Sequence, residues 1–123
     1  MRSFGLITNR RHALGQIIVC QGCCCGRVDR GKPEVPVEHL KSIWRQEKLN
    51  ASIQLTISGC LGPCDLCNVV VVVTPSGMTW LGGLTEPEQY QLLIDWARGC
   101  RSAGQLLPLP VPLQPHQFQR FVG

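Results

Sequence analysis

The sequence lacks a long apolar run. Its longest one, Val69 to Val73, falls far short of the roughly 20 residues that a membrane-spanning helix needs. The N-terminal segment, residues 1–14, is basic but has no apolar stretch of the kind that marks a secretory signal peptide. We therefore expect neither a membrane span nor export of the chain.

Familiar catalytic motifs are also missing. No glycine-rich loop ends in Lys-Ser or Lys-Thr, and no G-x-S-x-G is present. The histidines His12, His39 and His116 lie far apart in the sequence, so we expect each to be solvated rather than catalytic. Hydrolase and nucleotide-binding functions lack support. Because the sequence shows no second cofactor site either, we do not expect an enzyme.

The chain is basic without having the pattern of a nucleic-acid-binding module. Its formal net charge is +4 and its isoelectric point is about 8.7. Lys and Arg are nevertheless scattered along the sequence, and only one Tyr and three Phe are available for stacking on bases. We expect no nucleic-acid partner.

Cysteine is the residue type that the chain has in excess. Eight cysteines occur in 123 residues, a length that supports one domain with a modest core. Without a signal peptide, so many cysteines indicate metal or redox chemistry in a reducing compartment rather than a disulfide scaffold. We expect a cytoplasmic protein.

Four cysteines form two short loops, each of which follows a strand-like run. Cys20 and Cys25 make a C-x₄-C loop, and Cys60 and Cys64 make a C-x₃-C loop. If the two preceding strands pair in parallel, the loops meet at one edge of the domain. Four thiolates gathered in this way can hold an iron–sulfur cluster or a metal ion. Gly59 and Gly62 can take positive φ there and turn backbone N–H groups toward sulfur.

Apolar periodicity predicts the elements between these loops. The β-branched residues within 14–20 and the alternation over 53–57 predict the two strands that deliver the cysteines. The apolar run Val69 to Val73 predicts a central strand. A turn at 75–77 follows it, and residues 78–81 are predicted to form the second strand of the hairpin. A 3.6-residue period predicts a helix that begins near Val37, with a buried stripe of Val37, Leu40, Ile43 and Trp44.

The C-terminal third is predicted to hold a second helix and a tail. A capping box of Thr85 and Glu88 would begin that helix, and its buried stripe would be Tyr90, Leu93, Ile94 and Ala97. Cys100, near its end, is predicted to be a small buried apolar residue. Residues 106–115 alternate proline with aliphatic residues, which favours extended polyproline II conformation and argues against helix. The predicted organisation is a basic segment 1–14, a domain 15–103 and a Pro-rich tail 104–123.

The chain resembles the thioredoxin-like [2Fe-2S] ferredoxins, which share their fold with a small peripheral subunit of respiratory complex I. The resemblance lies in the two cysteine loops, including the sequence Gly59-Cys60-Leu61-Gly62-Pro63-Cys64, in the strand over 69–73 and in the hairpin over 74–85. It implies an α/β, thioredoxin-like fold of order β-α-β-β-β-α with the loops at one edge. It also implies a one-electron carrier with a redox partner protein, and it leaves a homodimer open. The implied cofactor is a [2Fe-2S] cluster with the ligands Cys20, Cys25, Cys60 and Cys64.

Other uses of the cysteines stay open. Cys20-x₂-Cys23 and Cys64-x₂-Cys67 have the local spacing of a structural zinc site, although the stretch between them is long. A dithiol oxidoreductase is a further alternative, and so is a cluster-bearing redox or iron sensor or adaptor. For Cys23, Cys24 and Cys67 we prefer a structural role. Cys25 is preferred as the second ligand because of the C-x₄-C spacing of the resembling family and because Gly26 frees the chain to turn.

Overall fold

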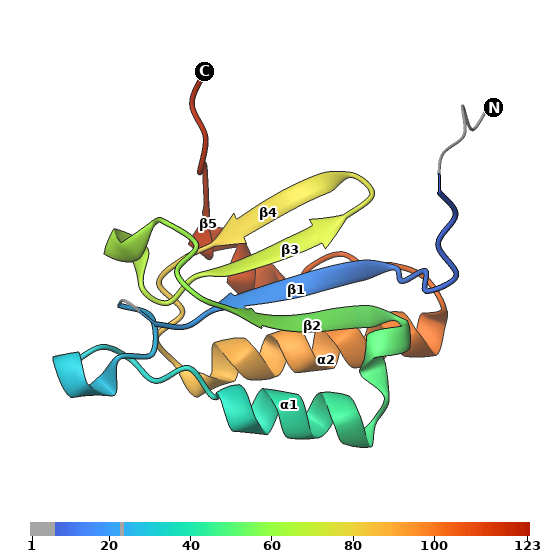
Figure 1. Cartoon of the computed structure of the whole chain (residues 1–123), viewed down its shortest axis with the longest axis horizontal. Coiled ribbons are helices and arrows are strands. Elements are labelled where there is room, and N and C mark those ends of the chain that lie inside the picture. The colour runs from blue at the N-terminus through green and yellow to red at the C-terminus, as the bar shows by residue number, and fades with distance from the viewer. Residues whose placement is uncertain (1–6, 23) are drawn as a thin grey trace.

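A computed structural model describes residues 7–22 and 24–123. These residues form a five-stranded sheet and two α-helices (Figure 1). Along the chain the elements are β1 (Gly15–Cys20), α1 (Val37–Gln46), β2 (Ile53–Ser58), β3 (Val70–Thr74), β4 (Gly77–Leu81), α2 (Pro87–Ala103) and β5 (Gln117–Phe118). The predicted order β-α-β-β-β-α is therefore confirmed, and β5 is an addition that the sequence did not predict. In the part of the chain described, no helix combines the length and the apolar character needed to cross a bilayer.

The sheet has the strand order β2-β1-β3-β4-β5. Its first pair, β1 and β2, is parallel, and the other three pairs are antiparallel. The parallel register runs from Gly15 opposite Ile53 to Cys20 opposite Ser58. Both strands therefore end at the same edge of the sheet, and each is followed there by one of the two cysteine loops.

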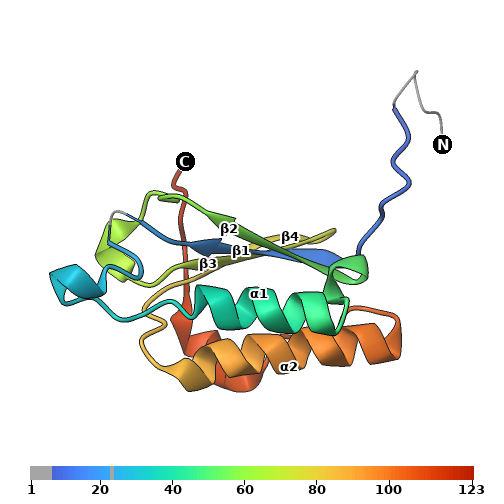
Figure 2. The same cartoon turned by 60° about the horizontal axis from the view of Figure 1, so that its bottom comes forward.

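Both helices cover one face of the sheet (Figure 2). Alternate residues of the central strands face them, and these are buried: Ile17 and Val19 in β1, and Val70 and Val72 in β3. The expected stripe of α2 is buried as well, and in α1 Val37, Leu40 and Trp44 are buried. The indole N–H of Trp44 donates to the Ile53 carbonyl at 2.7 Å and so joins α1 to β2.

The capping box of α2 lies one residue later than predicted. Glu86, not Thr85, is the N-cap, and its side chain accepts from the Gln89 backbone N–H. In return the Gln89 side-chain oxygen accepts from the Glu86 N–H at 2.9 Å. The shift places Pro87 at the first helical position, where the missing N–H costs no hydrogen bond. The helix runs past Gly99 and ends at Gly104, which has a positive φ of 67°.

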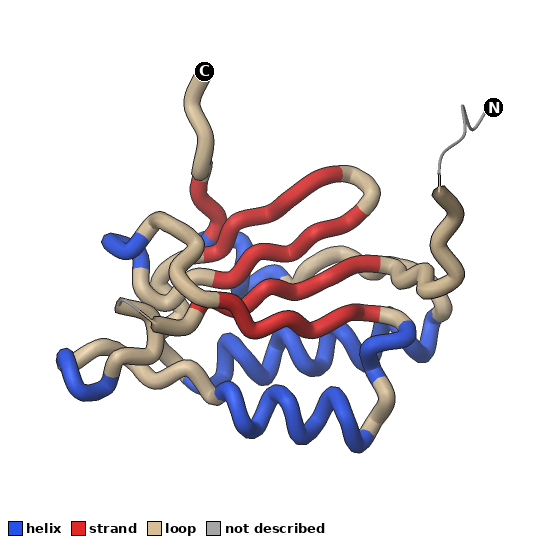
Figure 3. The backbone as a smooth tube through the Cα atoms, in the orientation of Figure 1, coloured by secondary structure: helices blue, strands red, loops and turns tan. Residues whose placement is uncertain are grey.

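The Pro-rich tail is not simply extended, so that part of the prediction was wrong. Residues Val111–His116 form a 3₁₀ helix, η4, and Leu113 within it is fully buried. Proline lacks only its own N–H, so the Pro110 carbonyl can still accept from the Leu113 N–H at 3.0 Å. Beyond η4, β5 pairs with β4 and extends the sheet (Figure 3). The Trp96 indole N–H also donates to the Leu107 carbonyl at 2.8 Å, which ties the tail to α2.

Candidate metal centre

The two cysteine loops lie together at one end of the molecule (Figure 1). This follows from the parallel pairing of β1 with β2, because parallel strands end at the same edge. Two backbone hydrogen bonds connect the segments where the strands end. Cys20 N–H donates to the Val69 carbonyl at 3.0 Å, and Gln21 N–H donates to the Ser58 carbonyl at 3.1 Å. The sheet thus brings together cysteines that are about 40 positions apart in the sequence.

The first loop presents a buried pair of thiols. Cys20 is 4% exposed and Cys25 is 2% exposed, and both side chains line the same small pocket. The loop is closed by the Gly22 N–H, which donates to the Cys25 carbonyl at 3.0 Å. Gly26 follows with a φ of 72°, a backbone conformation that side chains rarely adopt.

Burial has a chemical consequence for the Cys25 thiol. It raises the pKa of Cys25 far above the ordinary value, and the neighbouring Cys20 raises it further. Without a bound cation the thiol therefore stays protonated at neutral pH. A metal ion or cluster at this position would have to displace the proton, since the thiolate is the form that binds metal.

The second loop presents a pair of thiols nearer the surface. The sulfurs of Cys60 and Cys64 are 3.3 Å apart, and Cys60 is exposed. Gly62 between them has a φ of 118°, which side chains rarely adopt, whereas Gly59 does not take the positive φ that the sequence suggested. A Cβ on Gly62 would lie 2.5 Å from the Arg120 guanidinium, so the tail packs directly against this loop.

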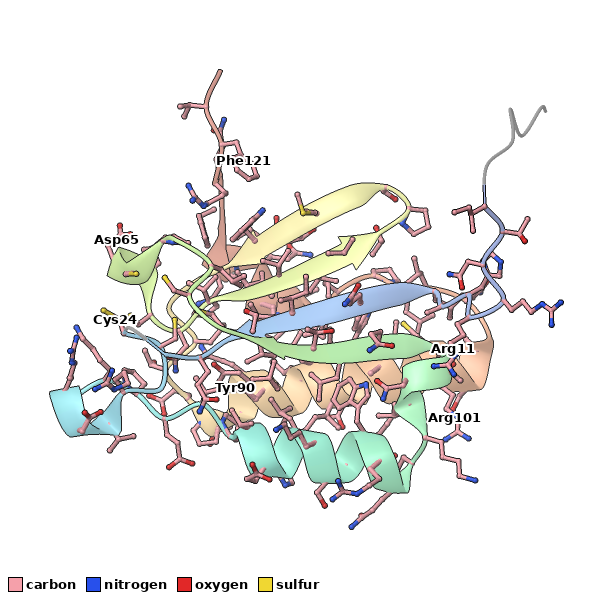
Figure 4. The ribbon with its side chains drawn as sticks, viewed as in Figure 1. Arg11, Cys24, Asp65, Tyr90, Arg101 and Phe121 are labelled. Atoms are coloured by element: carbon pink, nitrogen blue, oxygen red, sulfur yellow. The ribbon has the colours of Figure 1, made fainter. Side chains whose placement is uncertain are left out.

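The two pairs line one small pocket. Figure 4 shows sulfur atoms gathered at this end of the molecule, between the labelled residues Cys24 and Asp65. Asp65 itself is exposed. The residues that line the pocket are Cys20, Cys24, Cys25, Cys60, Gly62, Pro63, Cys64 and Val69.

Of the extra cysteines, Cys24 lines this pocket and Cys67 lies next to it. Burial raises the pKa of the Cys67 thiol, and the neighbouring Cys24 raises it further. The Cys67 thiol also donates to the Cys64 carbonyl at 2.8 Å. Cys24 is half-buried, whereas Cys25 is buried next to Cys20. Cys23 lies outside the described residues, so the zinc set that contains it stays an untested alternative.

A residue that the sequence analysis missed holds the first loop in place. Asn68 is fully buried, and its side-chain oxygen accepts from the Gly26 N–H at 2.9 Å. Its amide nitrogen lies within donor distance of the carbonyls of Pro33 (3.1 Å), Glu34 (3.3 Å) and Leu84 (3.2 Å). A single asparagine after a cysteine has no periodic signal, so no pattern in the sequence could have indicated it.

The other candidate residues lie away from the pocket. His12 and His39 are exposed, as expected. His116 is half-buried rather than fully solvated, because its ring is hydrogen-bonded at 2.8 Å to the Gly82 carbonyl and at 2.9 Å to the Gln89 side chain. Cys100 is fully buried, and its sulfur accepts from the Leu107 N–H at 3.3 Å.

Comparison with known proteins supports the fold. The structure is similar to the crystal structure of a thioredoxin-like [2Fe-2S] ferredoxin from Aquifex aeolicus, with a TM-score of 0.50 and 19% sequence identity. The match covers 89% of this chain and 100% of the ferredoxin. The fold is therefore thioredoxin-like, as predicted. No protein-family model and no curated protein sequence matches the chain.

Proposed function

We propose that the chain is a one-electron carrier that binds a [2Fe-2S] cluster through Cys20, Cys25, Cys60 and Cys64. The observation that carries this proposal is the arrangement of these thiols as two pairs around one pocket. The structurally similar Aquifex protein is a [2Fe-2S] ferredoxin, which supports the same reading.

The donor set fits this cofactor better than it fits a single ion. A [2Fe-2S] core has two irons, and each needs two protein ligands, so two pairs of thiolates are required. Within residues 7–22 and 24–123, no three His, Cys, Asp or Glu side chains are grouped as one ion would need. The buried pair is formed by Cys20 and Cys25, and the exposed side of the pocket is formed by Cys60 and Cys64.

When bound, the cluster supplies the site that takes up and releases one electron. The protein's own residues set the surroundings of that site. Leu61 and Leu66 are half-buried against the core and limit access of water on the side of the second loop. Cys60 is exposed, so this edge lies where a partner protein could approach. We therefore propose that a redox partner protein docks at this end. We also propose a cytoplasmic location for the protein.

Anaerobic purification followed by metal analysis tests the proposal. We expect about two iron and two sulfide ions per chain, with visible absorption bands that bleach on addition of dithionite. For a carrier the bands should return on reoxidation, whereas a sensor that loses its cluster would stay bleached. A colourless protein with stoichiometric zinc would refute the proposal and favour the structural zinc alternative.

Single serine variants test the ligand set. Cys20→Ser, Cys25→Ser, Cys60→Ser and Cys64→Ser should each lose the cluster or strongly destabilise it, while Cys100→Ser should keep it. Cys24→Ser is the matched control for Cys25→Ser, because it changes the neighbouring sulfur. Full retention of cluster and EPR signal in Cys25→Ser, together with loss in Cys24→Ser, would move the ligand one residue upstream.

A further inference from the structure

The only tyrosine of the chain carries a buried hydroxyl without a hydrogen-bond partner among the described residues. Tyr90 lies in the first turns of α2 and is 2% exposed. Buried side-chain polar atoms almost always have a partner, and an exception calls for an explanation such as a redox role or a missing acceptor. Neither packing nor capping of α2 needs this hydroxyl, because Glu86 and Gln89 form the cap.

The surroundings of Tyr90 indicate where the missing acceptor belongs. Its ring packs in the same core cluster as Cys20 and Cys25, and Figure 4 places it at the same end of the molecule as Cys24. Burial raises the pKa of Tyr90, and negative charge on Cys25 and Cys20 raises it further.

The other polar neighbour of Tyr90 is already engaged. The Asn68 side chain lies near enough to lower the pKa of Tyr90, but the two groups do not meet in hydrogen-bond geometry. The oxygen of Asn68 accepts from the Gly26 N–H, and its nitrogen is directed at backbone carbonyls. Among the described residues the Tyr90 hydroxyl is thus left without an acceptor.

We propose that Tyr90 is a positioning residue for the cluster, whose hydroxyl donates a hydrogen bond to a sulfur at the Cys20 and Cys25 side of the site. This inference rests on the proposed function. In the cluster-free protein both cysteines are thiols, which are weak acceptors. With the cluster bound they are thiolates, and sulfur becomes a much better acceptor for an O–H donor.

The hydrogen bond would shift the reduction potential of the cluster in a defined direction. Reduction adds negative charge to the cluster, so a donor aimed at its sulfurs stabilises the reduced state more than the oxidised state. Burial strengthens the effect, because the low local dielectric leaves the interaction poorly screened. Tyr90 therefore raises the reduction potential above the value it would have with an apolar ring in the same place.

Tyr90→Phe tests the proposal, with Trp96→Phe as the matched control. Both variants keep an aromatic ring in α2 and remove one donor, but the Trp96 donor is bound to the Leu107 carbonyl of the tail. The holoproteins are compared by redox titration and by resonance Raman spectra in H₂O and D₂O. The cluster-free proteins are compared by denaturant unfolding.

We expect Tyr90→Phe to lower the reduction potential and to abolish a deuterium-sensitive shift of the iron–sulfur stretching bands. Cluster-free Tyr90→Phe should be as stable as the unchanged protein or more stable, because it loses an unpaired buried hydroxyl. Trp96→Phe should lower stability and leave the potential unchanged.

Two results would overturn the inference. One is a Tyr90→Phe potential and Raman spectrum equal to those of the unchanged protein, and the other is a loss of stability in cluster-free Tyr90→Phe, which would reveal an acceptor within the protein. Iron and sulfide analysis of the unchanged protein separates these failures from a failure of the proposed function. If iron and sulfide are absent there, both proposals fail, and if they are present, only the role of Tyr90 is at stake.

Discussion

Replacing Asn68 by alanine removes a side chain that joins three segments around the cysteine pocket. The amide oxygen holds the Gly26 N–H directly after Cys25, and the amide nitrogen holds carbonyls of the loop before α1 and of Leu84. The side chain is fully buried, so water does not replace these bonds without entering the core. We therefore expect Asn68→Ala to be among the most destabilising single changes in the chain.

The magnitude follows from the groups left without a partner. An unsatisfied buried donor costs about 1–3 kcal/mol, and a lost hydrogen bond contributes about 1 kcal/mol. The Gly26 N–H loses its acceptor, and the two amide protons of Asn68 can satisfy at most two of the three carbonyls near them. The expected loss is about 3–5 kcal/mol, a large share of the roughly 5–15 kcal/mol that stabilises a typical domain.

Denaturant unfolding of the cluster-free protein measures this loss, and the rate of cluster release measures its effect on the site. Asn50→Ala is the matched control, because the exposed Asn50 oxygen also accepts one backbone N–H, that of Leu55 at 2.9 Å. The control should cost only about 0.5–1.5 kcal/mol and keep the cluster. If Asn68→Ala costs no more than Asn50→Ala and releases its cluster no faster, the positioning role assigned to Asn68 is wrong.

Three further predictions concern the tail, the second loop and pH. Leu113→Ala should cost about 2–5 kcal/mol in unfolding free energy, because this tail residue is fully buried, while the cluster spectrum should be retained. Gly62→Ala should cost about 1–3 kcal/mol and speed cluster loss, and Gly62→Ala/Arg120→Ala should recover only the part due to the clash, because the positive φ remains. The stability of the cluster-free protein should fall as the pH rises above about 9, because the unfolded Cys25 thiol ionises near its ordinary value of 9.0 while the folded one keeps its proton. A pH titration of unfolding should show a shallower fall for Cys25→Ala, and an equal fall would rule out Cys25 as the cause.

Most of the elements could be predicted because their signals are local. The alternation over 53–57 and the apolar run at 69–73 correspond to β2 and β3, the latter displaced by one residue. The stripes of α1 and α2 follow from the 3.6-residue period, which a helix imposes whatever it packs against. The order of the elements followed from the same patterns, and the resemblance to the ferredoxins implied that this order is thioredoxin-like. The cysteine spacing likewise identified the two loops, since each is contained in a few consecutive residues.

Where two local sequence signals competed, hydrogen bonding and packing in the folded chain decided which structure formed. Thr85 and Glu86 are both able to begin α2, and Glu86 does so because Pro87 then occupies the first helical position and Gln89 can return the hydrogen bond. The prolines of the tail argued against helix, yet a single 3₁₀ segment places Leu113 in the core. The free energy gained by burying Leu113 outweighs the weak preference of the tail's prolines for an extended conformation.

The sequence by itself determined which residues form the strands, the helices and the two cysteine loops, because each depends on neighbours within one or two turns. Only the tertiary structure decided what surrounds the pocket. Asn68 bonds to Gly26, 42 positions away, and Arg120 lies against Gly62 although the two are far apart in the sequence. Tyr90 looked like one more apolar position of a helical stripe until its hydroxyl was seen to have no partner among the described residues. These contacts arise when the sheet closes and brings distant segments together, and no periodicity within one segment encodes them.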